Sequence, residues 1–168
     1  MKAYDAAHIR NIALVGHGGA GKTTLAEAML FDGGGNTRLG RTEDGTSILD
    51  YDEDEIKRRL TINAAMAFLE WKGHKINLVD TPGFGAFLAD TQTCLRVLDI
   101  ALVVVSAPHG VQVVTDKVWS YATEAGLARV VYLSKMDRER ADFARAVEDV
   151  RKHLSPLAVP VQVPLGQE

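Results

Sequence analysis

The segment GHGGAGKTT at residues 16–24 combines residue types that bind phosphate groups, and it fits the pattern G-x-x-x-x-G-K-[ST]. Its glycines let the backbone approach phosphates closely, and free N–H groups at a helix N-terminus attract anions. We expect Lys22 to reach the β- and γ-phosphates of a nucleotide and the Thr23 hydroxyl to bind Mg²⁺. The expected phosphate-contacting residues are Gly16, His17, Gly18, Gly19, Ala20, Gly21, Lys22, Thr23 and Thr24. The alternative is a glycine-rich turn that fits the pattern by chance.

A second group of candidate residues is the tetrapeptide DTPG at 80–83, which follows an apolar run at 75–79. An aspartate in this place, here Asp80, can hold the metal ion, usually through water. Gly83 leaves a backbone N–H free to meet the γ-phosphate, and it can flex when that group leaves. Alone, D-x-P-G is also a common turn. After a phosphate loop, however, it predicts a switch II-like segment over 80–90.

The third candidate is SKMD at 134–137, which again closes an apolar run. The Asp137 carboxylate could accept hydrogen bonds from the two adjacent N–H donors on the pairing edge of guanine, and a buried acceptor rejects adenine, which lacks them. The Lys135 stem could lie on the base, and Ser134 begins the motif. A solvated Lys–Asp pair is the simpler interpretation of SKMD alone. As the third motif in the series, it favours a guanine nucleotide, GTP or GDP.

Residues 32–61 are rich in Gly, Asp and Thr, and they contain a dense charge cluster, DYDEDEIKRR, at 50–59. A loop of this length inside a compact domain is either functional or disordered, and we expect a switch I-like loop. Thr61 at its end could close over Mg²⁺ and the γ-phosphate, which would make the loop an order–disorder switch. The alternative is a Thr that merely opens a strand. The charge cluster is either a partner-facing switch segment or an ordinary solvated run. The expected metal-binding set is Thr23, Thr61 and Asp80.

Short β-branched runs alternate with helical patterns along the chain, which predicts an α/β fold. The runs lie at 11–15, 75–79, 101–105 and 129–133, and helical patterns follow at 22–31, 86–98, 112–125 and 139–154. This alternation indicates a mostly parallel sheet, and the apolar strands indicate helices on both faces. The link KGH joins AAMAFLEW to KINLV as an antiparallel hairpin. We therefore predict one P-loop NTPase G-domain over 1–168, with one antiparallel strand and a further strand in the proline-containing segment 154–168.

Composition excludes several classes of protein. The chain has 168 residues, of which 46% are hydrophobic and 24% charged, as is ordinary for one soluble domain. The longest apolar runs are too short to span a bilayer, and the first ten residues lack the apolar core of a secretory signal. The single cysteine, Cys94, suits a reducing cytoplasm, where we expect the protein. With a net charge of −3 and no basic residues interleaved with aromatic ones, we expect no direct sequence-specific binding of nucleic acid.

The sequence resembles the translational GTPases, above all the elongation factor G family and its elongation factor G-like paralogues. The resemblance covers nearly the whole chain from about Ile9, and it rests on RNIALVGHGGAGKTTLAEAML, LTINAAMAFLEWKGHKINLVDTPGF, LRVLDIALVVVSAPHGVQ and LSKMDRERADF. It implies a GTP-binding domain that works on the ribosome through domains outside this chain, with hydrolysis coupled to translocation or ribosome recycling. Ribosomal-protection and release-factor-type GTPases share much of the pattern and stay as alternatives. The domain is expected to be incomplete at its C-terminal end, because the family's fifth guanine motif does not occur before Glu168.

The chain departs from the family pattern at four places. The family usually has Asp where this chain has Gly19, Asn where it has Ser134, and Arg-Gly-Ile-Thr where it has RRLT at 58–61. The fourth departure is Phe84, which stands where the family usually has a His that would orient the attacking water. Phenylalanine can neither donate nor accept a hydrogen bond. Since losing one such group typically costs about 10²–10³ in rate, we expect slow intrinsic hydrolysis.

These residues leave several functions open. Hydrolysis would depend on Lys22, Thr61, Gly83 and the departure at Phe84, in an enzyme that the ribosome stimulates. The second hypothesis is a binding module that senses the GTP state and hardly turns over, and a third is an ATP-using P-loop protein. Without the fifth motif, the isolated chain is expected to bind nucleotide weakly, to expose apolar surface and to be a poor enzyme.

Overall fold

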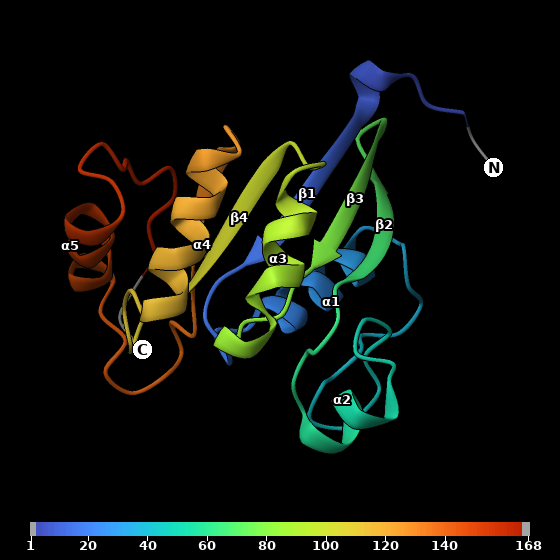
Figure 1. The fold of residues 1–168 in the computed structure, drawn as a ribbon, viewed down its shortest axis with the longest axis horizontal. Coiled ribbons are helices and arrows are strands. Elements are labelled where there is room, and N and C mark those ends of the chain that lie inside the picture. Colours follow the sequence, from blue (N-terminus) through green and yellow to red (C-terminus); the bar gives the residue numbers. More distant parts are fainter. Residues whose placement is uncertain (1–2, 166–168) are drawn as a thin grey trace.

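A five-stranded mixed sheet carries the loops that contain the predicted motifs (Figure 1). The computed structural model describes residues 3–165, and its strands are β1 (Ile9–Val15), β2 (Ala65–Trp71), β3 (His74–Asp80), β4 (Ile100–Ser106) and β5 (Ala128–Ser134). Their order in the sheet is β2-β3-β1-β4-β5. β2 is antiparallel to β3, and the other neighbouring strands are parallel. The predicted sheet with one antiparallel strand is confirmed.

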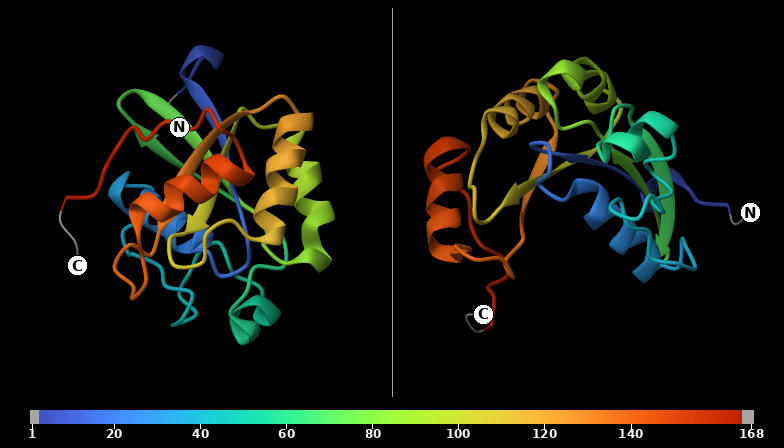
Figure 2. Two further views of the ribbon diagram at one scale, coloured as in Figure 1. Left: turned by 90° about the vertical axis from the view of Figure 1, so that its left-hand side faces the viewer. Right: turned by 90° about the horizontal axis from the view of Figure 1, so that it is seen from below.

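Helices cover both faces of this sheet, as predicted (Figure 2). The helices of the described residues are α1 (Lys22–Asp32), α2 (Glu53–Arg58), α3 (Leu88–Leu95), α4 (Val113–Glu124) and α5 (Phe143–His153), with two short 3-10 helices, η1 (Ala6–His8) and η2 (Gly85–Phe87). On one face, Leu95 of α3 and Val118 of α4 pack against Val103 of β4. On the other face, Leu30 of α1 packs with Leu78 of β3. Each fully buried side chain of this kind contributes about 1.5–3 kcal/mol.

The parallel strands bring the three motifs to one edge of the sheet. The segment 16–21 follows β1, DTPG begins at the last residue of β3, and Ser134 is the last residue of β5. Leu14 of β1 lies opposite Asp80 of β3, so the first two motifs leave the sheet side by side. Ligands of open α/β sheets bind at this carboxyl edge.

The structure differs from the expected elements in two segments. The loop 32–61 contains α2, which Asp52 and Glu55 stabilise with a complete capping box. The further strand expected in 154–168 is wrong for the described residues up to 165, which form turns and extended chain outside the sheet. Pro160 and Pro164 lie in this segment and cannot donate a backbone hydrogen bond to a strand ladder.

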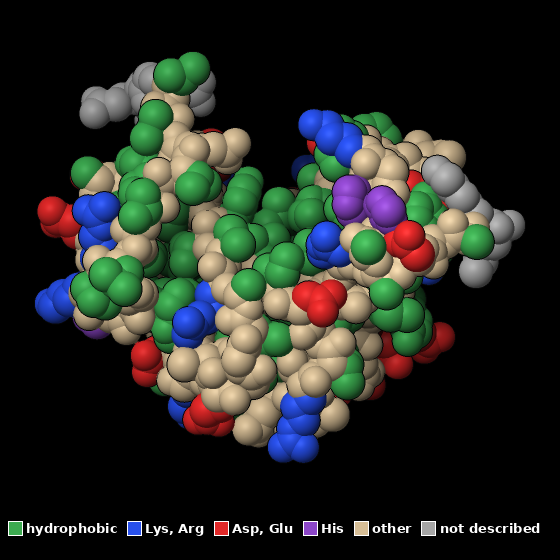
Figure 3. All heavy atoms as spheres, turned by 90° about the horizontal axis from the view of Figure 1, so that it is seen from above, with side chains coloured by type: hydrophobic (Ala, Val, Ile, Leu, Met, Phe, Trp, Pro, Cys, Tyr) green, Lys and Arg blue, Asp and Glu red, His purple; other side chains and the backbone are tan. Residues whose placement is uncertain are grey.

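Exposed apolar side chains gather beside β5 at the end of the sheet. Val130 and Tyr132 are about half exposed, and Val161 and Leu165 of the following segment are almost fully exposed. Together with α5 they line an open apolar groove of about 950 Å³. Figure 3 shows the molecule from above, with a hollow in which apolar side chains lie. The exposed apolar surface expected from the sequence is therefore present.

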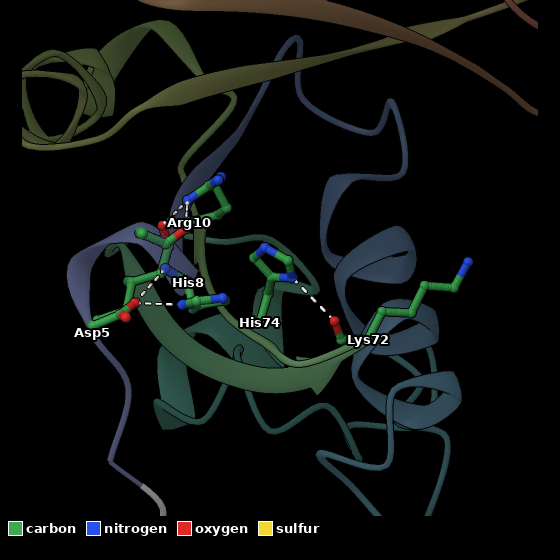
Figure 4. A network of polar contacts seen from close by, with 7 residues as sticks. Asp5, His8, Arg10, Lys72 and His74 are labelled. Carbon is green, nitrogen blue, oxygen red and sulfur yellow. Dashed lines mark hydrogen bonds and ion pairs between the residues drawn. The ribbon is translucent and has the colours of Figure 1, made fainter.

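The amino edge of the sheet carries a second group of polar contacts (Figure 4). Asp5 caps η1, and its carboxylate accepts a hydrogen bond from the His8 backbone. The His8 ring lies 2.5 Å from the same carboxylate and 5.2 Å, centroid to centroid, from the ring of His74. These residues lie where β1 and β3 begin, at the end of the sheet opposite the three motifs. Within residues 3–165, no helix is both long enough and apolar enough to cross a membrane.

Candidate nucleotide-binding site

The loop between β1 and α1 has the backbone shape that its glycines permit. A side chain at Gly16 would collide with the carbonyl oxygen of Val104, so only glycine lets the loop leave β1 so close to β4. Gly21 has a left-handed backbone with φ 98° and is the N-cap of α1. The first turn of α1 therefore leaves free N–H groups facing the loop. Ala20 is buried, and Gly19 and Thr24 are exposed.

Lys22 is folded back onto this loop. Its side chain is buried, and Nζ donates a hydrogen bond of 3.2 Å to the carbonyl oxygen of His17. Burial lowers the pKa of Lys22, and the negative charges of Asp80 and Asp50 oppose that shift. A buried ammonium group with one carbonyl partner is short of acceptors, because it has three N–H donors. The phosphate oxygens of a nucleotide would supply them.

Thr23 and Thr61, two of the expected metal ligands, meet beside the phosphate loop. Thr23 Oγ1 donates to Asp80 Oδ2 over 2.6 Å, and Thr61 Oγ1 donates to Asp50 Oδ1 over 2.9 Å. The two Oγ1 atoms are 3.1 Å apart, and all four residues are buried. Each hydroxyl has one proton, and both protons go to carboxylates. The two oxygens therefore face each other with lone pairs, which is a suitable environment for a cation.

Asp80, like Lys22, is a buried charged group whose hydrogen bonds are incomplete among the described residues. It is fully buried, and its Oδ1 atom has no hydrogen-bond partner among the described residues. Burial raises the pKa of Asp80 to about 7, although Lys22 and the Thr23 hydroxyl oppose the shift. Hard oxygen donors of this kind suit Mg²⁺, which usually takes one or two carboxylates together with water and substrate phosphates. The residues present fit the ion.

Three carboxylates that sequence reasoning did not assign hold the loop 32–61 in place. Glu27 of α1 is fully buried, and its Oε1 accepts hydrogen bonds from Ser47 Oγ and the Ile48 N–H. Glu55 of α2 accepts from the N–H groups of residues 62 and 63, next to Thr61. Asp50 accepts from Thr61 itself, and burial raises its pKa. The solvated-run interpretation of 50–59 is therefore wrong for Asp50 and Glu55.

Sequence alone carries only weak signals for these three acids. Glu27 stands four residues after Thr23 on a helix, which places both on one face. Asp50 and Glu55 stand among other acidic residues that are exposed, and nothing in their spacing separates the buried ones. Their roles follow from the path of the loop back to α1.

The turn at 80–83 lies directly on the phosphate loop. A side chain at Gly83 would collide with Lys22 Nζ and with the backbone of residues 17 and 18. Gly83 therefore lies beside Lys22, and its contact with a terminal phosphate stays a prediction. Phe84 follows as the N-cap residue of η2, and 43% of its surface is exposed. Its ring lies against Gly18 rather than in the apolar core.

The third motif is joined to the first through its serine. Ser134 is buried, and its Oγ donates a hydrogen bond of 2.6 Å to the carbonyl oxygen of Ala20. Lys135 has a left-handed backbone with φ 58°. Asp137 is exposed, and Arg138 Nε lies 3.6 Å from its carboxylate. Recognition of guanine by Asp137 stays a prediction, and a base would have to replace Arg138 beside this carboxylate.

Two histidines lie in or near the loop, His17 within it and His109 after the end of β4. His17 Nδ1 is buried without a hydrogen-bond partner within residues 3–165. Burial lowers the pKa of His17, and the charges of Lys22 and His109 act in the same direction. His109 Nδ1 lies 3.0 Å from Ser106 Oγ at the end of β4. His17 therefore takes part in the loop through its backbone, whose carbonyl oxygen accepts the hydrogen bond from Lys22.

The order of the strands and the loop between β1 and α1 place this chain among the P-loop nucleotide-binding domains. The family described as elongation factor Tu GTP binding domain matches residues 7–164, and the chain belongs to this family. The α/β G-domain predicted from the sequence is therefore confirmed.

Several individual proteins are similar to this chain along nearly its whole length. Elongation factor G of Ureaplasma parvum serovar 3 is 39% identical over 159 residues, which are 95% of this chain and 23% of that protein. Elongation factor G of Mycoplasma pneumoniae is 38% identical over 167 residues, which are 99% of this chain and 24% of that protein. A crystal structure of a protein from Thermus thermophilus is 42% identical with a TM-score of 0.91, over 96% of this chain and 24% of that chain. The resemblance to elongation factor G is confirmed, and the chain spans about a quarter of the length of these relatives.

Proposed function

We propose that this chain binds GTP and GDP together with Mg²⁺, and that the protein containing it is a translation factor that hydrolyses GTP on the ribosome. The observation that carries the proposal is the buried Thr23–Thr61 pair beside the phosphate loop. A switch I-like loop that brings its Thr to the Thr of the phosphate loop is arranged to sense a metal and a terminal phosphate. Coupling of hydrolysis to translocation or to ribosome recycling is part of the proposal, because the relatives are elongation factors G.

The metal would be held by the hydroxyls of Thr23 and Thr61, with Asp80 bound through water. Asp50 would keep the Thr61 hydroxyl in position, since it already accepts its proton. When bound, Mg²⁺ neutralises charge that develops on the β- and γ-phosphate oxygens. The chain itself would supply Lys22 Nζ and the backbone N–H of Gly83 to the same oxygens.

Phe84 makes the intrinsic rate slow in this proposal. Phosphoryl transfer to water requires a positioned water molecule, and the Phe84 ring offers no polar atom to position it. We infer that the ribosome supplies or rearranges the missing contact, so that hydrolysis is stimulated on it. The ribosome would be reached through parts of the protein outside residues 1–168, in the cytoplasm, without a membrane partner or sequence-specific nucleic-acid contact of this domain.

The nucleotide part of the proposal is tested by titrating a fluorescent GDP analogue into the chain with Mg²⁺. GDP and GTP should displace the analogue at lower concentration than ADP. Tighter binding of ADP would exclude the guanine role of Asp137 and favour an ATP-using protein. For this chain we expect a Kd well above the nanomolar range, and a nanomolar Kd would contradict the weak binding expected from the sequence.

The second candidate function is a GTP-state binding module with little turnover, and the apolar residue at Phe84 favours it. Single-turnover hydrolysis by the full-length protein, with and without ribosomes, separates the two candidates. Faster phosphate release with ribosomes supports the enzyme. Tight GTP binding without stimulated release supports the binding module.

A further inference from the structure

The Phe84 ring has a specific seat on the phosphate loop. A Cβ atom on Gly18 would lie 2.7, 2.8 and 2.9 Å from Cζ, Cε2 and Cε1 of Phe84, closer than real Cβ atoms approach any atom. The distal edge of the ring therefore rests on Gly18. Gly18 is not among the residues with a left-handed backbone, so the ring, and not the backbone conformation, requires glycine at this position.

Gly83, the residue before Phe84, lies against the phosphate-binding groups of the same loop. A Cβ atom on Gly83 would collide with Lys22 Nζ, and it would lie 2.7 Å from the Gly18 nitrogen. Lys22 Nζ meanwhile donates to the His17 carbonyl oxygen. A terminal phosphate would need both Lys22 Nζ and the loop N–H groups. The turn therefore lies where a terminal phosphate would have to approach these groups.

We propose that Phe84 is a latch that holds the switch II-like segment closed on the phosphate loop, with Gly18 as its seat, and that bound phosphate opens the latch. The proposal rests on the proposed function in one respect, namely that phosphates are what the loop binds. A ligand shifts such an equilibrium because it binds only the open state. Apparent affinity falls by the fraction of molecules that are open, so the latch weakens nucleotide binding. Phe84 is thus a positioning residue, in addition to its effect on the attacking water.

Two substitutions should break the latch from opposite sides. Phe84→Ala removes the ring, and Gly18→Ala puts a methyl group where the ring rests. Hydrogen–deuterium exchange of amides in 80–90 of the nucleotide-free protein should accelerate about tenfold in each variant, since opening of the segment costs less. Because both changes remove one contact, the double variant should exchange no faster than either single variant. Additive effects would overturn the latch, and so would wild-type exchange in Gly18→Ala.

A third substitution separates a latch from general apolar packing. Phe84→Tyr adds an oxygen to Cζ, the ring atom nearest the Cβ position of Gly18. The hydroxyl would meet the loop, so the variant should also exchange faster although it keeps the aromatic ring. Wild-type exchange in Phe84→Tyr would mean that the ring is not seated on Gly18. Circular dichroism on each variant shows whether the chain is still folded.

Matched controls come from the same chain. Phe31→Ala removes a ring that is also 43% exposed, and Gly85→Ala adds a methyl group where no atom lies within 4 Å. Neither should change exchange in 80–90 beyond about twofold. Association of the fluorescent GDP analogue should be faster in Phe84→Ala and Phe84→Tyr than in the wild type. Failure of the wild type to bind guanine nucleotides would overturn the proposed function but leave the nucleotide-free exchange result standing.

Discussion

The two edges of the sheet each carry a carboxylate with a short hydrogen bond, but the surroundings of the two carboxylates differ. At the carboxyl edge, Asp80 is fully buried and accepts from Thr23 over 2.6 Å. At the amino edge, the Asp5 side chain is 69% exposed and lies 2.5 Å from the His8 ring (Figure 4). Burial raises the pKa of Asp80 to about 7, whereas the hydrogen bond with His8 lowers the pKa of Asp5. The hydrogen bond lowers the pKa of the carboxylate at both edges, but at Asp80 burial outweighs it.

Solvent explains the difference. Water around Asp5 stabilises its charge, so its contacts with His8, above all the side-chain hydrogen bond, lower its pKa. Asp80 has lost that water, and neither the nearby Lys22 charge nor the Thr23 hydroxyl replaces it. A buried carboxylate with an unpartnered oxygen is costly unless a ligand completes it. The carboxyl edge is therefore the region of the molecule that is suited to bind a ligand.

The largest expected effect is on nucleotide affinity. Lys22→Ala should weaken binding of the fluorescent GDP analogue by about 10³-fold, because hydrogen bonds from a charged group are worth about 1.5–3 kcal/mol each and Lys22 should make two. Titration measures the effect. Lys72→Ala at the β2–β3 turn, near the amino edge, is the matched control and should leave the affinity unchanged. Equal losses in both variants would contradict the comparison of the edges.

The second effect is a pH dependence of stability in the nucleotide-free protein. The pKa of Asp80 is raised from 3.8 to about 7 on folding, so between these values the unfolded chain releases a proton that the folded chain keeps. Stability from this group is complete below about pH 4 and is lost as pH rises towards 7, by a few kcal/mol. Chemical denaturation of the wild type and of Asp80→Asn should show it. The variant should have the flatter profile, and Asp5→Asn should not flatten it.

The third effect concerns the buried threonine pair. Thr61→Ala should destabilise the nucleotide-free protein by about 1–3 kcal/mol, because Asp50 is left buried without its hydroxyl partner. Thr24→Ala, at an exposed position of α1, should cost no more than about 0.5 kcal/mol. Urea unfolding of both variants measures the difference. Equal stabilities would show that the Thr61–Asp50 contact is not formed.

The smallest effect is expected at the amino edge. His8→Ala removes the ring next to the Asp5 carboxylate, yet exposed pairs of this kind contribute little to stability. Urea unfolding should detect little change, and nucleotide affinity should not change at all. An effect on nucleotide affinity would mean that the two edges are coupled.

Most of the fold could be predicted from local patterns. The β-branched runs correspond to β1, β3, β4 and β5, and the KGH link corresponds to the turn between β2 and β3. The segment 154–165 shows the limit of such patterns. Its alternating Val residues resemble a strand, but a strand requires a partner for its backbone, and the described residues place none beside it.

The site could be predicted only in part, for a related reason. Gly16, Lys22, Thr23 and Asp80 follow one another in patterns whose chemistry is local to a strand end and a helix start. Glu27 could not be assigned, because its partners lie 20 and 21 residues along the chain. Glu55 could not be assigned, because its partners in the loop are backbone N–H groups, which no side-chain pattern shows. Likewise, the sequence identified Phe84 as a departure but not its seat on Gly18, which is 66 residues earlier in numbering.

The sequence by itself determined the class of domain, the order of its motifs and the residue types available for phosphate and metal, because each motif carries its own backbone requirements. Only the tertiary structure decided which carboxylates lose their water. Asp50, Glu55 and the exposed acids between them are alike in sequence, and the path of the loop over α1 buries two of them. Burial depends on neighbours that are distant in the chain. No local sequence pattern therefore predicts the pKa shifts of Asp80 and Asp50 or the contact between Phe84 and Gly18.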